Sequence, residues 1–167
     1  SESGEEGTFE LIDNVVNTSY IHQGLRSFKG CYKISAVDRS GNESELSEAI
    51  CNDNCPYYEL PNVFTPNGDS MNDVFQAFDS FDETTNAYKC TRFVRNVDFY
   101  VYDRNGKEVY NNLDEVEKSV LIKWNGTNNN GKEMPSGMYF YLADVTFDVL
   151  DRDNQNVQLR GWINLLK

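Results

Sequence analysis

The chain has 167 residues, of which 39% are hydrophobic and 13% aromatic, with ten Tyr and ten Phe. This composition is sufficient for one or two small domains with a packed core, and the aromatic content favours β-strands. The formal net charge of −12 disfavours nucleic acid as a partner, because no basic stripe is present to displace counterions from phosphates.

The chain opens on a polar stretch, residues 1–7, which reads as a linker or a cut end, so we expect any export signal to lie upstream. Residues 8–16 predict a strand, and residues 18–25 predict a strand edge that leads into a loop. The single histidine, His22, is too few for a multi-histidine metal site and a poor start for a Ser-His-Asp triad. We expect it to be a surface histidine beside Tyr20.

Residues 30–51 predict a hairpin around the turn 38–42, where Gly41 is able to adopt positive φ. The stretch YKISAVDRSGNES at 32–44 resembles the end of a fibronectin type III domain, which commonly reads Y-x-V-x-A-x-D-x-x-G-N-E-S. A complete sandwich of that type has about seven strands and about 100 residues. We therefore expect residues 1–52 to be the C-terminal part of a fibronectin type III-like domain, truncated at its N-terminus. The alternative is a half-sandwich that leans on another surface.

The chain has four cysteines, Cys31, Cys51, Cys55 and Cys90. An even number in a small β-rich chain suggests two disulfides and an oxidising compartment. Three pairings are open, and we expect Cys31–Cys51 and Cys55–Cys90, because each bond then lies within one segment. The spacing from Cys51 to Cys55 does not match a zinc or redox pair, and no second close pair follows.

Residues 55–167, after the linker 52–54, are long enough for a complete sandwich. Turn signals and short alternating runs recur along this segment, and helical periodicity is nearly absent. The expected elements are strands at 57–66, 73–81 and 119–126, a hairpin at 91–112 around Asp103–Gly106, a polar turn at 127–137, and a final hairpin of 138–150 and 156–167 around 151–154. The fold class predicted is all-β: an immunoglobulin-like antiparallel β-sandwich preceded by a partial fibronectin type III-like sandwich.

Four polar residues, Asn67, Asp69, Asn72 and Asp73, lie between the first two of these strands. Carboxylate and amide oxygens are calcium ligands, so the four form a candidate calcium site, although the spacing is not that of an EF-hand. Asn, Asp and Gly also build turns by hydrogen-bonding their own backbone. We favour the turn, and we expect no cofactor other than this candidate calcium.

Four blocks of the second segment resemble, in order, the type B C-terminal sorting domain of the type IX secretion system, also called the gliding motility-associated C-terminal domain. LPNVFTPNGDSMNDVF (60–75) is similar to P-N-x-F-x-P-N-G-D-G-x-N-D-x-F, and FYVYDRNGKEVY (99–110) to x-I-Y-D-R-W-G-x-x-V-F. WNGTNNNGKEMPSGMYFY (124–141) and GWINLLK (161–167) resemble the third and last family blocks. The chain departs from the family at Ser70, where Gly is usual, at Asn105, where Trp is common, and at Asn125, where Asp is common.

This resemblance implies an address label rather than an enzyme. A cargo bearing such a domain enters the periplasm by a cleaved signal peptide, docks with the type IX machinery and crosses the outer membrane. Type B domains are associated with outer-membrane partners of the PorP/SprF family, which retain the cargo on the cell surface. Typical cargoes are large adhesins, so the resemblance implies a secreted, outer-membrane-associated adhesin.

The last strand alternates, with Arg160, Trp162, Asn164 and Leu166 on one face. Trp and Arg are favoured recognition anchors, and an edge strand is able to extend a partner's sheet through its backbone. The candidate partner-binding residues are Arg160, Gly161, Trp162, Ile163, Asn164, Leu165, Leu166 and Lys167. The alternative function is a calcium-stabilised or carbohydrate-binding β-sandwich, with Trp124 and Trp162 as sugar platforms. No motif isolates a catalytic pair, so we do not expect an enzyme.

Overall fold

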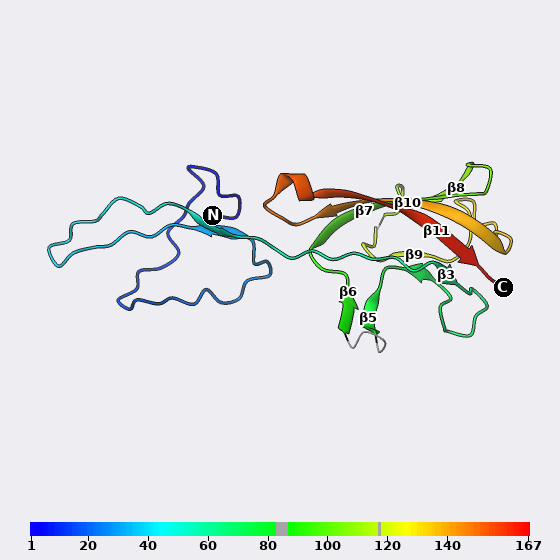
Figure 1. The fold of residues 1–167 in the computed structure, drawn as a ribbon, viewed down its shortest axis with the longest axis horizontal. Coiled ribbons are helices and arrows are strands. Elements are labelled where there is room, and N and C mark those ends of the chain that lie inside the picture. The colour runs from blue at the N-terminus through cyan, green and yellow to red at the C-terminus, as the bar shows by residue number, and fades with distance from the viewer. Residues whose placement is uncertain (83–86, 117) are drawn as a thin grey trace. The chain divides into compact units, whose positions relative to one another are not determined.

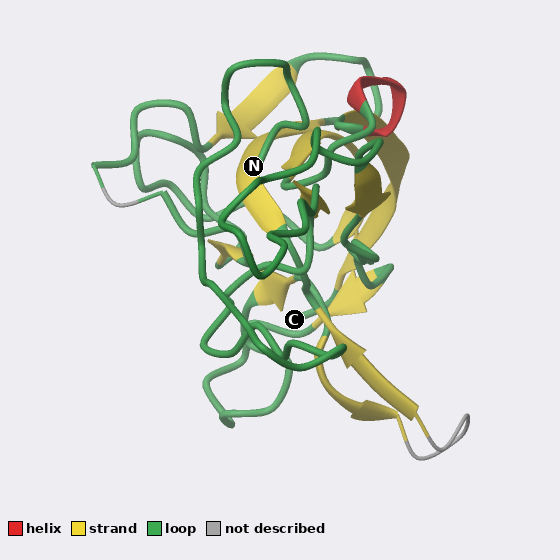
Figure 2. Cartoon of the chain, turned by 90° about the vertical axis from the view of Figure 1, so that its left-hand side faces the viewer, coloured by secondary structure: helices red, strands yellow, loops and turns green. Residues whose placement is uncertain are grey.

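The computed structural model describes residues 1–82, 87–116 and 118–167 (Figure 1). Two compact units are present: Ser1–Asn54 with Val149–Asp151, and Cys55–Asp148 with Arg152–Lys167. Within the described ranges, strands dominate and the helical structure is one 3-10 turn, η1 (Arg152–Asn154), drawn in red in Figure 2. None of the described helical structure is long and apolar enough to cross a membrane. The predicted all-β class is confirmed.

The first unit is organised around one antiparallel hairpin. Strands β1 (Gly30–Tyr32) and β2 (Ile50–Asn52) pair with Cys31 opposite Cys51, and the two cysteines form the predicted disulfide. Beyond these strands the arms share a bridge between Val37 and Glu43 and backbone hydrogen bonds from Ser44 to Ala36 and from Ser47 to Ile34. The hairpin predicted at 30–51 is therefore confirmed, but its arms are paired as strands only at β1 and β2.

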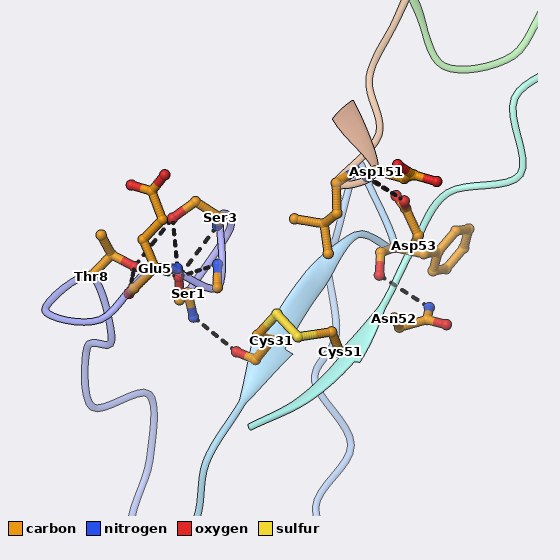
Figure 3. The surroundings of a disulfide bond; sticks show 12 residues. Ser1, Ser3, Glu5, Thr8, Cys31, Cys51, Asn52, Asp53 and Asp151 are labelled. Carbon is orange, nitrogen blue, oxygen red and sulfur yellow. Dashed lines mark hydrogen bonds between the residues drawn. A yellow bond between two sulfur atoms is a disulfide. The ribbon is translucent and has the colours of Figure 1, made fainter. Parts of the chain in front are cut away.

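The disulfide lies among backbone hydrogen bonds rather than in an apolar core (Figure 3). The N–H of Cys31 donates to the Ser1 carbonyl at 2.8 Å, and the Ser1 amino group donates to the Cys31 carbonyl at 3.0 Å. Nearby, the buried Asn54 side chain accepts from the N–H of Phe28 at 2.8 Å and donates to Ser27 Oγ at 2.8 Å. A covalent bond and polar contacts thus hold this unit.

The strands expected at 8–16 and 18–25 are not formed. Both stretches are irregular, and their large apolar side chains, such as Leu11 and Ile21, are exposed. A strand needs a partner ladder for its backbone groups, and no described strand pairs with these residues. β-propensity alone was therefore a misleading signal here.

A five-stranded sheet forms one layer of the second unit (Figure 1). Its pairings are antiparallel except for that between the first two strands, which is parallel. The order is β3 (Val63–Phe64), β11 (Asn156–Leu165), β10 (Gly137–Phe147), β7 (Val94–Tyr102) and β8 (Glu108–Asn111). Both hairpins predicted around the turns at 103–106 and 151–154 are confirmed. The strand predicted at 57–66 shortens to β3, because Pro61 and Pro66 flank it and proline cannot donate to a ladder.

The other layer contains one short pair, β4 (Phe75–Gln76) with β9 (Ile122–Trp124). A second short pair, β5 (Asp79–Asp82) with β6 (Ala87–Cys90), projects from this unit as a separate hairpin (Figure 1). Aromatic side chains fill the space between the layers: Phe75 stacks on Phe99 with ring centroids 5.7 Å apart and meets Trp124 edge-on at 6.4 Å. The fully buried side chains include Phe64, Phe75, Phe99, Ile122, Trp124, Ile163 and Leu165. This two-layer packing is that of the predicted β-sandwich.

Three turns share one five-residue conformation: Asp38–Asn42 in the first unit, and Asp103–Lys107 and Asn128–Lys132 in the second. In each, the side-chain oxygen of the first residue accepts from the N–H groups of the third and fifth. The fourth residue is a glycine with φ between 75° and 84°. The backbone bonds from Lys107 and Asn105 lower the pKa of Asp103, and the Asn42 side chain, followed by the backbone bonds, lowers the pKa of Asp38. The turn is therefore specified locally, by its own Asp or Asn and Gly.

The second predicted disulfide, Cys55–Cys90, is not formed, and both thiols are free. Tyr57 and Arg92 form an antiparallel bridge with N–O distances of 3.2 and 3.0 Å. Cys55 lies two residues before Tyr57, and Cys90 lies two residues before Arg92. Because the two segments run antiparallel, the cysteines lie on opposite sides of the bridge. They are therefore separated by about four residues, or roughly 13 Å. A disulfide requires Cα atoms within about 7 Å, so the register corrects this prediction.

Candidate functional site

The final strand, β11, has the alternation that the sequence predicts. Ile163 and Leu165 are fully buried, whereas Trp162 is 51% exposed. Gly161 also faces inward, and a Cβ there would lie 2.8 Å from the ring of Tyr141, its cross-strand partner. Glycine is required because the Tyr141 ring covers this position. Gly161, Ile163 and Leu165 are therefore packing residues, and the structure brings none of them to the surface for a partner.

The outward residues of β11 differ in how far they are engaged. Asn164 donates its N–H to the Asn62 carbonyl at 2.8 Å and so ties the strand to the chain before β3. Lys167 forms an ion pair with Glu133 at 2.6 Å. Arg160 and Trp162 project from the middle of the strand and have no side-chain hydrogen bond within the described structure. These two are the residues most free to contact a partner.

Cross-strand register extends this surface over three strands. Trp162 lies opposite Phe140 on β10, and Phe140 lies opposite Tyr102 on β7. In the next row, Arg160 lies opposite Leu142, which faces Tyr100. Phe140 and Met138 are 45% and 53% exposed, Arg160 and Trp162 are also exposed, and Tyr100, Tyr102 and Leu142 are half-buried. We define the outer face as Tyr100, Tyr102, Met138, Phe140, Leu142, Arg160 and Trp162.

Carboxylates surround this apolar row. Burial, followed by the nearby charges of Asp98, Asp144 and Glu108, raises the pKa of Tyr100. Asp98 itself is paired with Lys118, whose hydrogen bond lowers the pKa of that carboxyl. An aromatic centre with an acidic margin is the composition of a protein-recognition patch, because aromatic residues are enriched at interface centres and charges lie at the rim.

Sequence reasoning missed Phe140, Tyr102 and the rest of the row because it considered one strand at a time. A signal was present: Phe140 and Trp162 are equidistant from Asp151, at the predicted turn of the last hairpin. A hairpin centred there places these two residues opposite each other. Tyr102 required the pairing of β10 with β7, which joins segments that no single turn connects.

The candidate calcium loop is closed by its own backbone. The Thr65 N–H donates to the Asn72 carbonyl at 2.8 Å. The Asp73 carboxylate accepts from the N–H groups of Gly68 and Ser70 at 2.7 and 2.8 Å. The arrangement is that of a structural turn, and the loop joins β3 to β4.

The second acidic side chain of this loop, Asp69, is engaged in the same way. It accepts from Asn67 Nδ2 at 2.9 Å and from the Met71 N–H at 2.8 Å, and these bonds lower its pKa. Across the described residues, no group of three His, Cys, Asp or Glu side chains is positioned to hold a metal ion. Calcium at this loop stays a prediction.

Trp124 is not a sugar platform, which corrects one element of the alternative function. Its side chain is 1% exposed, and its Nε1 donates to the Thr127 carbonyl at 2.7 Å. The following Gly126 has φ of +82°, and a Cβ there would lie 3.0 Å from Leu165. The WNG stretch therefore closes the core below the last strand.

His22 takes no part in the outer face. It is half-buried in the first unit, with its Nδ1 3.0 Å from the Tyr32 hydroxyl and its ring 6.2 Å from that of Tyr20. This is the surface position that the sequence predicts.

The second unit is thus a β-sandwich with an exposed aromatic face. Comparison with protein-family models matches residues 58–165 to the CHU_C type IX secretion signal domain. The chain belongs to this family. A search of curated proteins found no match.

Membership of this family gives the coarse function. The domain sorts the protein that carries it to type IX secretion, so it interacts with that machinery, and the protein is secreted or displayed at the cell surface. A secretion signal domain is not a catalytic family.

Proposed function

We propose that residues 55–167 are a type B C-terminal sorting domain that directs a large cell-surface adhesin through the periplasm and the type IX machinery. The immediate partner is an outer-membrane protein of the PorP/SprF family, which retains the cargo at the cell surface. The observation that carries this proposal is the outer face, where Trp162, Phe140 and Met138 are about half exposed on a regular sheet. An exposed apolar patch of this kind on a folded module is typical of a docking site.

Within the predicted partner-binding segment, we assign contact to Arg160, Trp162 and Leu166, whose side chains are exposed. The inward residues act through the fold, because they hold the strand against β10 and the core. Lys167 and Asn164 fix the end of the strand by their bonds to Glu133 and Asn62. The sorting signal is accordingly a folded surface rather than a linear peptide.

Residues 1–52 we assign to the cargo, as the C-terminal part of a fibronectin type III-like domain. What supports this is the exposure of apolar side chains along the hairpin and the preceding loops. Leu11, Ile34 and Ile50 are each more than 70% exposed, although they are residues that ordinarily lie in a sandwich core. Repeated sandwich domains suit an extended adhesin.

Export of a reporter tests the sorting function. Residues 1–167 are fused behind a cleaved signal peptide and a fluorescent protein in cells with a working type IX system. We expect the intact chain to deliver the reporter outside the outer membrane, and the double variant Arg160→Ala/Trp162→Ala to leave it in the periplasm. Lys107→Ala/Leu113→Ala, two exposed positions away from the outer face, is the matched control. Equal export by the two double variants, with equal melting temperatures, contradicts the proposal.

A carbohydrate-binding role is the second candidate, because Trp162 and Phe140 form an exposed aromatic pair. Sugar rings stack on such side chains. In this case Trp162→Ala and Phe140→Ala abolish binding to a glycan array while the reporter is still exported. Loss of export without any glycan affinity in the parent chain excludes this candidate.

A further inference from the structure

The backbone of β11 has a definite inner and outer side. The Gln155 carbonyl accepts from the Phe147 N–H at 2.7 Å, toward β10, whereas the Asn164 N–H donates away from β10, to the Asn62 carbonyl. The β10–β11 register runs without a shift from residue 156 to residue 165. Because backbone groups alternate along a strand, the even-numbered residues direct both N–H and C=O away from β10. These residues are Asn156, Gln158, Arg160 and Trp162.

Only the end of this outer edge is covered. Strand β3 pairs with Asn164 and Leu165 and no further. The chain that precedes β3 pairs with other segments instead of β11: Tyr57 is bridged to Arg92, and the Glu59 carbonyl accepts from the Phe78 N–H at 3.0 Å. No described strand therefore lies beside residues 156–162. That open edge is about seven residues, or roughly 23 Å, long.

At the opposite edge of the same sheet, a side chain from the turn 128–132 caps the backbone of the last residue of β8. On β8, the Asn129 side chain accepts from the Asn111 N–H at 2.9 Å and donates to the Asn111 carbonyl at 3.0 Å. A register shift between Val101 and Tyr102 also interrupts that pairing. Such devices prevent strand addition. The β11 edge has no proline, no register shift and a single charged residue, Arg160.

We propose that an extended segment of a type IX transport protein adds to the sheet as a strand beside Asn156–Trp162. This inference rests on the sorting function proposed above and specifies how the partner is held. Alternating N–H and C=O groups at this spacing match only another extended polypeptide. The backbone contact with the partner is thereby placed at the first seven residues of β11, because β3 already pairs with the backbone of Asn164 and Leu165.

The side chains along the edge define the chemistry of the added strand. On the outer face, a strand beside Trp162 extends the row formed with Phe140 and Tyr102, so an apolar residue fits there. Arg160 has no ion-pair partner within the described structure, so a carboxylate fits one position along that face. A second copy of the chain is a poorer occupant, because a net charge of −12 on each molecule opposes self-association.

A backbone-specific variant tests this proposal. Gln158→Pro removes one outward N–H but none of the backbone hydrogen bonds between β10 and β11, because the Gln158 N–H points away from β10. It also removes the side-chain hydrogen bond from Gln158 Nε2 to Asp144 on β10. Gln158→Ala is the matched control, since it removes the same side chain and keeps the N–H. In the reporter assay we expect Gln158→Pro to lower the exported fraction about tenfold and Gln158→Ala to change it less than about twofold. Equal export by the two variants overturns strand addition and leaves the sorting function standing.

Hydrogen exchange gives a second readout that does not depend on the proline variant folding. The probe is the detergent-solubilised type IX translocon purified from competent cells, added to the 167-residue chain. We expect the amides of Gln158, Arg160 and Trp162 to exchange quickly in the free chain and to become protected when the translocon is added. Protection of other segments alone overturns the proposal. So does protection of these amides in the absence of the translocon, if sedimentation also shows that the chain is a dimer. If the parent chain neither binds nor exports, the sorting function itself fails.

Discussion

The two units of this chain use the same turn and reach different degrees of order. Asp38–Asn42 and Asp103–Lys107 have matching hydrogen bonds and a glycine with positive φ at the same place. In the first unit, the arms that leave the turn are paired as strands only around the disulfide. In the second, the turn joins β7 to β8 in a sheet over an aromatic core. A turn positions two arms, but buried side chains are needed to keep them paired.

The core accounts for this difference. Trp124, Phe75 and Phe99 contact one another at the centre of the second unit, with almost no exposed surface. In the first unit, Cys31 is the buried hydrophobic residue at the hairpin, and Ile34 and Ile50 on the same hairpin are open to solvent. We therefore expect the second unit to be stable by itself and the first to depend on its disulfide.

Removing the centre of the core gives the largest effect. Trp124→Ala deletes a fully buried side chain and its bond to the Thr127 carbonyl, so we expect a loss of about 3–5 kcal/mol in the unfolding free energy of the second unit. Trp162→Ala, which removes the exposed tryptophan, is the matched control and costs less than about 1 kcal/mol. Urea denaturation followed by circular dichroism measures both. Similar losses from the two variants contradict the division between a core and a surface tryptophan.

Replacing both Cys31 and Cys51 with Ser tests the first unit. The disulfide spans 20 residues in sequence, and a loop of that length corresponds to about 3 kcal/mol of stabilisation in the chain-entropy model. We expect amide protection at Gly30–Tyr32 to disappear, while the melting temperature of the second unit stays the same. Hydrogen exchange resolved by residue measures both outcomes. Persistent protection of this hairpin shows that the first unit has a core of its own.

Local chemistry explains which parts of the fold the sequence predicts. The turn at 103–106 carries Asp, Asn and Gly, and the turn at 151–154 carries Asp and Asn, which are residues that build turns. Alternation fixes the faces of β7, β10 and β11. The strands expected at 8–16 and 18–25 do not form, because no described strand pairs with these residues despite their β-propensity. The predicted disulfide between Cys55 and Cys90 is wrong, because it rested only on both residues lying in the same segment. A disulfide also requires a strand register that brings the two cysteines together.

The site shows the same limit. Trp162 and Arg160 follow from alternation within one strand, and Phe140 and Tyr102 become visible only after three strands are placed side by side. Trp124 is buried and Trp162 is exposed, and no local pattern in the sequence around either residue predicts this difference. The open edge of β11 depends on where the chain before β3 goes, and this is a property of the whole sandwich.

A buried amide in the second unit gives an intermediate effect. Asn112 is fully buried, its Oδ1 accepts from the Phe99 N–H at 2.8 Å, and its Nδ2 donates to the Val97 carbonyl at 3.0 Å. Asn112→Ala leaves both backbone groups unpaired, so we expect a loss of about 2–3 kcal/mol. The exposed Asn130→Ala is the control and should be neutral. If Asn112→Ala is also neutral in urea denaturation, β7 does not depend on this side chain.

The smallest effect is a gain of stability at Ser70, where the family usually has glycine. Ser70 has φ of +67°, a left-handed conformation that costs a residue with a Cβ about 1 kcal/mol, and the bond from its N–H to Asp73 does not involve its side chain. Ser70→Gly removes that strain and also loosens the unfolded chain, so we expect a net gain of about 0.5 kcal/mol, seen as a rise of a few degrees in the melting temperature of the second unit. Ser70→Ala keeps the Cβ and the strain, so it should give no gain and serves as the control. The first unit should show no change in amide protection with either variant. A loss of stability in Ser70→Gly would mean that the serine side chain, and not the backbone conformation, holds the loop between β3 and β4.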